Sequence, residues 1–337
     1  MERWKYEESP SMDPLGHRKA LPQEVQLFPL GFPLTLKTNS GDVAAAGREG
    51  MGEFQPAFDT EPIELRVAVE GDAAEPPWNS PEGPAFQAQG HLLALVLGQE
   101  NFVVCDLERG LGFGRLSPGV ARNHLYTGFH FLECAAYVCL CQRYLTPIHA
   151  ACVAREGRGA LLVGGPGAGK SSLAWACARA GLTFVSDDAT WLLRDGVQPA
   201  AGVEAGGPTL IGRPQRMRFR PDTVNLIPEL AQARRLETVI GKHSFEIRTA
   251  EMPGVTTALG CRPGPVVFLE RKENGAAEVR AVGAEETRRR LAEASSLYEP
   301  RVWREQEASR EQLARGGGLV LRYSGLGEAV AQIRKLL

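Results

Sequence analysis

The sequence has no long hydrophobic run, no marked excess of charge of either sign and no internal repeat. A membrane-spanning helix needs about 20 apolar residues in succession, so neither a membrane span nor a membrane partner is predicted. The N-terminal letters MERWKYEE are too charged for a secretory signal peptide. A net charge of −2 over 337 residues gives no support for nonspecific binding to nucleic acid, so nucleic acid is not expected as a partner.

A disulfide pattern is also missing. The chain has seven cysteines, an odd number, and most of them lie in apolar runs, which is typical of buried reduced thiols. Cys134, Cys139 and Cys141 share one predicted helix, but a C-x-C spacing without a second ligand pair is poor for zinc. Reduced thiols fit a reducing compartment, so we expect a cytoplasmic protein.

Three segments are predicted along the chain. Residues 1–22 are polar with scattered prolines and are expected to form a loose tail. Residues 23–120 contain short alternating runs, such as 63–69, and predict a small antiparallel β-rich module without recognisable chemistry. Residues 121–337 are expected to form a second, larger domain, which begins with a buried helix at 123–144 capped by Asn123.

The most specific motif in the second domain is GGPGAGKS at 164–171, which fits G-x-x-x-x-G-K-[ST] at every fixed position. An apolar run at 160–163 predicts a buried strand before it, and 172–180 predicts a helix after it. The flanking strand and helix argue against the alternative of a chance glycine-rich turn. The predicted nucleotide-binding residues are Gly164, Gly165, Pro166, Gly167, Ala168, Gly169, Lys170, Ser171 and Ser172.

The physical role of such a loop follows from its backbone. Glycines let several N–H groups point at one anion, and the following helix N-terminus adds partial positive charge. Lys170 is expected to reach the β- and γ-phosphates, and the Ser171 hydroxyl is expected to ligate Mg²⁺. The motif therefore predicts a nucleotide site, with ATP and Mg²⁺ as the expected ligands.

Two carboxylates, Asp187 and Asp188, end the next predicted strand, 17 and 18 residues after Lys170. One can hold Mg²⁺ near the γ-phosphate, and the other can take the proton from an attacking hydroxyl. The alternative is a pair that serves only the turn. His149 begins the strand predicted to pair with the loop-feeding strand, and it is either a structural histidine or a group beside the carboxylates.

Basic residues gather at 213–220 and again at 234, 235 and 242. Phosphoryl transfer needs positive charge beyond that of Mg²⁺, and a loop arginine or lysine often supplies it. Arg213 and Lys242 are the selected candidates, and a solvated basic face is the alternative.

These motifs, with IHAA at 148–151 and FVSDD at 184–188, resemble the catalytic domain of the HPr kinase/phosphorylase family, in particular its shorter HPr-kinase-related serine kinases. The resemblance covers about 120–337 and is strongest over 147–193. It implies an α/β fold, a P-loop kinase domain of the HPr kinase/phosphoenolpyruvate carboxykinase type, here preceded by the β-rich module. It also implies that His149 and Asp187 work at the hydroxyl being phosphorylated and that Asp188, with Ser171, serves the metal.

The sequence departs from the family in two places. The family's N-terminal domain is missing, and TLIGRPQRMR at 209–218 stands in place of its Gly/Asn-rich loop. HPr itself is therefore not implied as the substrate. Members of the family form oligomers, which leaves a homo-oligomer open for this chain.

The resulting expectation is an ATP-dependent kinase that transfers the γ-phosphoryl group to a hydroxyl of a protein, peptide or small molecule, with serine as the favoured acceptor. Two alternatives stay open: a nucleotide-binding regulatory or accessory protein without turnover, and an NTP hydrolase.

Overall fold

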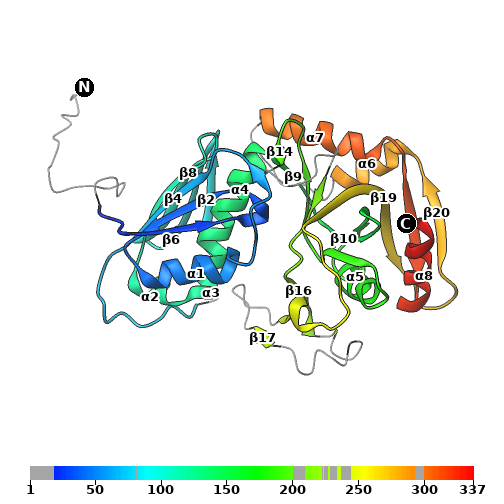
Figure 1. The fold of residues 1–337 in the computed structure, drawn as a ribbon, viewed down its shortest axis with the longest axis horizontal. Coiled ribbons are helices and arrows are strands. Elements are labelled where there is room, and N and C mark those ends of the chain that lie inside the picture. Colours follow the sequence, from blue (N-terminus) through cyan, green and yellow to red (C-terminus); the bar gives the residue numbers. More distant parts are fainter. Residues whose placement is uncertain are drawn as a thin grey trace. The chain divides into compact units, whose positions relative to one another are not determined.

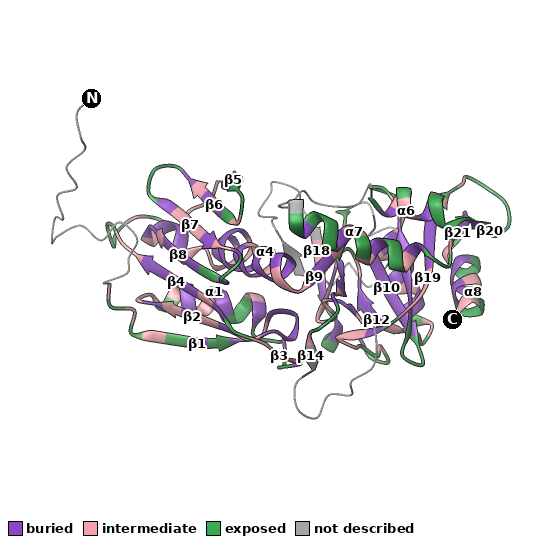
Figure 2. Ribbon diagram, turned by 90° about the horizontal axis from the view of Figure 1, so that it is seen from above, coloured by how far each residue is buried: buried purple, intermediate pink, exposed green. Residues whose placement is uncertain are grey.

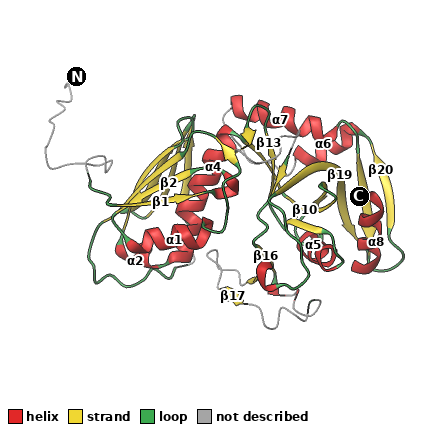
Figure 3. Cartoon of the chain, viewed as in Figure 1, coloured by secondary structure: helices red, strands yellow, loops and turns green. Residues whose placement is uncertain are grey.

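The structure is a computed structural model that describes residues 19–80, 82–199, 209–221, 223, 227, 234–236, 244–292 and 300–337. Within these ranges the chain is a mixed α/β protein with several sheets, divided into two compact units (Figures 1 and 3). One unit comprises the described residues up to Gln55 together with Glu61–Cys139, and the other comprises Pro56–Thr60 with the described part of Leu140–Leu337. No helix in the described ranges is long and apolar enough to cross a membrane.

The first unit contains a seven-stranded sheet in the order β1-β2-β4-β8-β7-β6-β5. β4 is parallel to both of its neighbours, β2 and β8, while the other neighbouring strands are antiparallel. The prediction of an antiparallel module was therefore wrong at the centre of this sheet. The strands are β1 (Gln23–Leu27), β2 (Leu34–Thr38), β4 (Ile63–Val69), β5 (Ala85–Gln89), β6 (Leu92–Leu97), β7 (Asn101–Asp106) and β8 (Leu111–Leu116), with a 3-10 turn η1 at Pro29–Gly31.

Helix α1 (Gly41–Met51) is the crossover that makes β2 and β4 parallel. Its sequence GDVAAAGREGM contains three glycines, which are poor helix formers, and this hides the helix from a prediction based on propensity. The Ser40 side chain caps the helix by accepting a hydrogen bond from the Val43 N–H at 3.5 Å. Gly47 allows close packing on the sheet, because a Cβ there would lie 2.8 Å from Cδ2 of Leu36.

A helical stretch follows the seven-stranded sheet. It consists of α2 (Pro118–Arg122), α3 (His124–Tyr126), the π-helical η2 (Thr127–Glu133) and α4 (Cys134–Arg143). Asn123 caps α3 as the sequence predicted, since its side-chain oxygen accepts from the Tyr126 N–H at 3.0 Å. The boundary between the two compact units falls between Cys139 and Leu140, within α4, whereas the sequence-based limits begin the second domain at residue 121.

The second unit is built on a nine-stranded sheet with the path β12-β10-β11-β19-β15-β13-β9, to which β21 and β20 are added beside β19. β11, β19 and β21 are parallel, and β10 is antiparallel to both β11 and β12. The strands are β9 (Leu145–Ile148), β10 (Ala150–Arg155), β11 (Arg158–Val163), β12 (Thr183–Ser186), β13 (Thr190–Leu193), β15 (Leu210–Ile211), β19 (Gly260–Arg271), β20 (Glu278–Val282) and β21 (Gly318–Tyr323).

This strand pattern brings several chain segments to one edge of the sheet. The carboxyl ends of β11, β12, β19 and β21 all lie at that edge, as does the amino end of β10. In sheets with parallel strands, the loops after the carboxyl ends are the usual place for a ligand. The glycine-rich stretch follows β11 at this edge.

Helices cover both faces of the nine-stranded sheet (Figures 1 and 3). α5 (Lys170–Arg179) and α8 (Leu326–Leu336) contribute Leu173 and Ile333 to the core on one face. α6 (Ala284–Ala292) and α7 (Pro300–Ala314) contribute Leu291 and Ala314 to the core on the other. Figure 2 shows the strands between them as buried. The sheet edge described above therefore belongs to a rigid three-layer scaffold.

Two small sheets complete the second unit. β16 (Arg216–Phe219), β18 (Ser244–Arg248) and β17 (Arg234–Leu236) form a three-stranded antiparallel sheet, and β14 (Gln198–Pro199) pairs with β3 (Phe58–Asp59). A 3-10 turn, η5 (Thr249–Glu251), follows β18.

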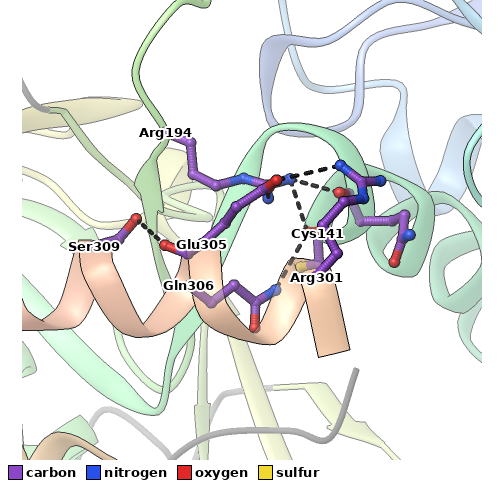
Figure 4. Close-up of polar contacts among 7 residues, drawn as sticks. Cys141, Arg194, Arg301, Glu305, Gln306 and Ser309 are labelled. Atoms are coloured by element: carbon purple, nitrogen blue, oxygen red, sulfur yellow. Dashed lines mark hydrogen bonds and ion pairs between the residues drawn. The ribbon is translucent and has the colours of Figure 1, made fainter. Parts of the chain in front are cut away.

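A buried arginine ties α7 to the end of α4 (Figure 4). The Arg194 side chain is 9% exposed and donates to the carbonyl oxygens of Cys141 and Gln142 at 3.2 and 2.6 Å. It also pairs with Glu305 of α7. A cation is favourable at a helix C-terminus, where backbone carbonyls lack intrahelical partners.

Candidate functional site

The glycine-rich loop joins β11 to α5, so the strand and the helix that the sequence predicted on its two sides are both present. Gly167 and Gly169 have φ angles of 84° and 90°, a left-handed conformation that glycine adopts without steric cost. The Ala168 N–H donates to the Gly165 carbonyl at 3.1 Å and closes a turn. The loop therefore leads directly into the N-terminus of α5, where backbone N–H groups favour an anion.

Lys170 is the first residue of α5, and it is only 7% exposed. Its Nζ donates to the Gly164 carbonyl at 2.7 Å and lies 3.1 Å from Nε2 of His149. Burial lowers the pKa of Lys170, the charge of Asp188 opposes this shift, and the charge of Arg220 adds to it. Within the described residues, no carboxylate lies at ion-pair distance from this ammonium. A phosphate group in the loop would supply the missing negative charge.

The two aspartates follow β12 in its short connection to β13, and hydroxyl groups hold this connection in place. Ser186 Oγ and Thr190 Oγ1 lie 2.6 Å apart, and Thr190 Oγ1 donates to the Ala150 carbonyl at 2.8 Å. All three residues are buried. Because Ala150 begins β10 directly after His149, these bonds tie the aspartates to the histidine.

Asp187 is half-buried, and its side chain is directed at the backbone of β16. Its Oδ2 accepts from the Arg218 N–H at 2.6 Å, while its carbonyl oxygen accepts from Ser171 Oγ at 3.3 Å. Burial raises the pKa of Asp187 to about 6, although the hydrogen bond from Arg218 opposes the shift. A carboxyl group with this pKa is a stronger base than an ordinary aspartate and is still ionised near neutral pH.

The exposed Asp188 completes a chain of three side chains. His149 Nδ1 lies 3.5 Å from Asp188 Oδ1, while its Nε2 faces Lys170 Nζ. With the ring proton on Nδ1 toward the carboxylate, Nε2 offers its lone pair to the ammonium. The structure thus brings together His149, Lys170 and Asp188, which are separated by 21 and 18 residues in the sequence.

The donor atoms near the loop suit magnesium carried by a nucleotide. Across the described ranges, no group of three or more His, Cys, Asp or Glu side chains is arranged to hold a metal. Ser171 lies against the Asp187 backbone, and Asp188 follows in the same connection. A hydroxyl and a carboxylate are hard oxygen donors, and Mg²⁺ commonly takes its other ligands from phosphate and water. The residues therefore fit a metal that binds with the nucleotide.

Of the two basic residues selected from the sequence, the structure describes one. Arg213 lies half-buried in the connection between β15 and β16, and Lys242 lies outside the described residues. Arg220, exposed just after β16, is close enough to act on the pKa of Lys170. Arg218 gives its backbone N–H to Asp187, while its guanidinium pairs with Glu246 at 2.9 Å. The arginine run was visible in the sequence, but Arg220 was not selected, because nothing local shows which of its members faces the loop.

No protein-family model matches the chain, and no curated protein matches it. Among solved structures, the chain is similar to the Hpr(Ser) kinase/phosphatase from Coxiella burnetii. The alignment covers 56% of this chain and 96% of that chain, with 13% sequence identity and a TM-score of 0.30. A likeness at this TM-score says nothing of the activity, which depends on the side chains of the site.

Proposed function

We propose that the protein is an ATP-dependent kinase with a P-loop domain of the HPr-kinase-like type. It transfers the γ-phosphoryl group to a hydroxyl of a protein, peptide or small molecule, with serine as the favoured acceptor. One observation carries the proposal. A buried lysine at the head of a glycine-loop helix shares one sheet edge with Asp187, whose pKa burial raises to about 6.

The phosphate-binding half of the site consists of the loop amides and Lys170. The buried ammonium is held by the Gly164 carbonyl and by His149, so it is oriented before a nucleotide arrives. Ser171 and Asp188 would hold Mg²⁺, which when bound neutralises part of the phosphate charge. Arg220 adds positive charge on the same side.

The acceptor half of the site consists of Asp187 and its hydrogen-bond partner. The acceptor oxygen attacks the γ-phosphorus, the bond to ADP breaks, and the hydroxyl proton passes to the Asp187 carboxylate. The Arg218 N–H occupies Oδ2, which leaves Oδ1 for the acceptor. His149 acts through Lys170 and Asp188 and is a positioning residue. A protein that only binds nucleotide has no need of a base beside the phosphate site, and this favours turnover over the regulatory alternative.

The test combines labelled ATP with matched variants. The purified protein is incubated with γ-labelled ATP and an extract of the source cells, and labelled products are examined for phosphoserine. Lys170→Ala should lose both nucleotide binding and transfer. Asp187→Asn should keep its nucleotide affinity within about threefold and lose transfer by about 10²- to 10⁴-fold. Asp195→Asn, an exposed aspartate after β13, is the matched control and should transfer normally.

Each outcome separates one alternative. Full transfer by Asp187→Asn would refute the base assignment. Nucleotide binding by wild type without a labelled product favours a regulatory protein. Release of inorganic phosphate at the same rate with and without acceptors favours an NTP hydrolase.

A further inference from the structure

We propose that Arg271 binds the phosphate chain of the nucleotide and that Tyr323 positions it. This inference rests on the proposed nucleotide site, to which it adds a ligand outside the glycine-rich motif. Arg271 lies 101 residues after Lys170 in the sequence, and Tyr323 lies a further 52 residues on.

Strand β19 extends far enough to lie beside the glycine loop. It runs parallel to β11 with Val163 opposite Phe268, and it continues for three further residues alongside the glycine loop. The two are in close contact there, since a Cβ on Gly164 would lie 3.4 Å from Cβ of Leu269. The last residue of β19 is Arg271, and Tyr323 of β21 lies opposite it in the parallel register. Both side chains therefore start beside the loop.

Tyr323 is in direct contact with the glycine loop. Tyr323 is fully buried, and its hydroxyl donates to the Ala168 carbonyl at 2.7 Å. A Cβ on Gly169 would lie only 2.4 Å from this hydroxyl. Burial raises the pKa of Tyr323, so the phenol keeps the proton that it donates, although the charge of Arg271 opposes the shift. Tyr323 thereby fixes the carbonyl side of the loop.

The Arg271 guanidinium packs on the Tyr323 ring and takes no part in an ion pair within the described residues. Its central carbon lies 5.4 Å from the centroid of the Tyr323 ring, within the range of a cation–π contact. One of its nitrogens lies 3.7 Å from the position of a Cβ on Gly169. Arg271 is exposed, and within the described residues no ion pair involves it. The neighbouring Glu270 is instead paired with Arg290 and Arg322, at 3.3 and 2.9 Å.

A guanidinium held in this way suits a phosphate. Successive side chains of a strand point to opposite faces, so Glu270 and Arg322 face away while Arg271 and Tyr323 face the loop. Arginine binds phosphate oxygens through two parallel N–H groups, and stacking on an aromatic ring orients these groups beforehand. The charge of Arg271 is therefore available to a nucleoside di- or triphosphate in the loop.

The test measures the affinity of the whole protein for ATP, ADP and adenosine at low and high salt. Arg271→Gln should weaken the binding of ATP and ADP by about 10- to 100-fold, since a charge-assisted hydrogen bond contributes about 1.5–3 kcal/mol. Its affinity for adenosine should not change, and the salt dependence of ATP binding should decrease. Arg322→Gln, one residue from Tyr323 and facing away, is the matched control and should behave as wild type. Thermal unfolding without ligand checks that each variant folds.

The role of Tyr323 is tested by coupling. Tyr323→Leu removes the ring under the guanidinium together with the bond to the Ala168 carbonyl, and ATP binding should weaken about 3- to 10-fold. The double variant with Arg271→Gln should bind ATP about as well as Arg271→Gln alone, because both changes act on one contact. Additive losses would assign Tyr323 to the fold only.

The outcomes also distinguish this inference from the proposed function. If Lys170→Ala abolishes ATP binding while Arg271→Gln binds ATP as wild type does, the inference is wrong and the nucleotide site stands. If Arg271→Gln loses adenosine and ATP equally, Arg271 does not bind phosphate. If wild type binds none of the three ligands, both the inference and the proposed function are overturned.

Discussion

Replacing Asp187 by asparagine should stabilise the protein at high pH while it abolishes phosphoryl transfer. The reason is the cost of holding a carboxylate in a partly buried position. Burial raises the pKa of Asp187 from 3.8 to about 6, so the folded state binds the proton more tightly than the unfolded state does. Stability is therefore lost as the pH rises from the unfolded-state value through the folded-state value.

The magnitude follows from the size of the shift. The difference between a pKa of 3.8 and one of about 6 corresponds to about 3 kcal/mol at and above neutral pH. About half of this penalty is already present at about pH 5, so between about pH 5 and pH 8 wild type should lose about 1 kcal/mol of stability relative to the variant. The asparagine oxygen can still accept the hydrogen bond from the Arg218 N–H, so the substitution leaves little unpaired.

The assay is urea unfolding of wild type and Asp187→Asn at about pH 5 and pH 8. Tryptophan fluorescence can follow the second unit, because Trp175 and Trp191 lie within it. The advantage of the variant should be larger at pH 8 by the amount given above. Asp195→Asn removes an equal charge from an exposed position and is the matched control, since Asp188 itself acts on the pKa of Asp187. An advantage that is the same at both pH values would show that burial does not raise the pKa of Asp187.

Three further results are expected. The rate of transfer at low acceptor concentration should fall as the pH decreases through about 6, because Asp187 becomes protonated, and a rate that is flat between about pH 5 and 8 would contradict its role as base. Arg194→Met should destabilise the second unit by about 2 to 3 kcal/mol in urea unfolding, since it removes a side-chain donor from the Gln142 carbonyl and leaves the Cys141 carbonyl with the Gln306 amide, whereas the exposed Arg301→Met should cost less than about 1 kcal/mol; equal costs would rule out this account. His124 lies between Asp42 and Glu49; burial lowers its pKa, but its hydrogen bonds to both carboxylates outweigh this and raise the pKa above 6.5. The stabilising contribution of His124 is therefore fully present below pH 6.5 and is lost as the pH rises through its raised folded-state pKa. Hydrogen exchange in α1 should then become faster with rising pH than the intrinsic exchange rate alone predicts. This additional increase should vanish in His124→Gln.

The parts of the site that could be predicted are local in sequence. The strand, the glycine loop and the helix at 160–180 follow from an apolar run and a motif whose residues are neighbours in the chain. The aspartates could be found because they directly follow the next apolar strand. In the first unit the same method failed at Gly41–Met51, where packing on the sheet stabilises a helix whose glycines argue against it. Missing that crossover led to the wrong prediction of an antiparallel sheet.

The arginines show most clearly which parts of the site could not be predicted from the sequence. Arg213 and Arg220 belong to one run, and only the pairing of β16 with β18 and the bond from Arg218 to Asp187 bring that run beside the loop. The contribution of Lys242 stays a prediction, since it lies outside the described residues. Tyr323 carried no signal at all, because a tyrosine at the end of a strand is usually a packing residue.

By itself the sequence determined which chemical groups the proposed site contains: a glycine-rich loop, a lysine, a hydroxyl and two carboxylates in a fixed order. It could do so because a motif is a statement about neighbouring residues, whose geometry the backbone restricts. Only the tertiary structure decided that Asp187 is desolvated, that His149 faces Lys170, and that Arg271 and Tyr323 lie beside the loop. Burial and strand register depend on segments that lie from 21 to 155 residues apart in the sequence, and the properties that turn a phosphate site into the proposed kinase arise from them.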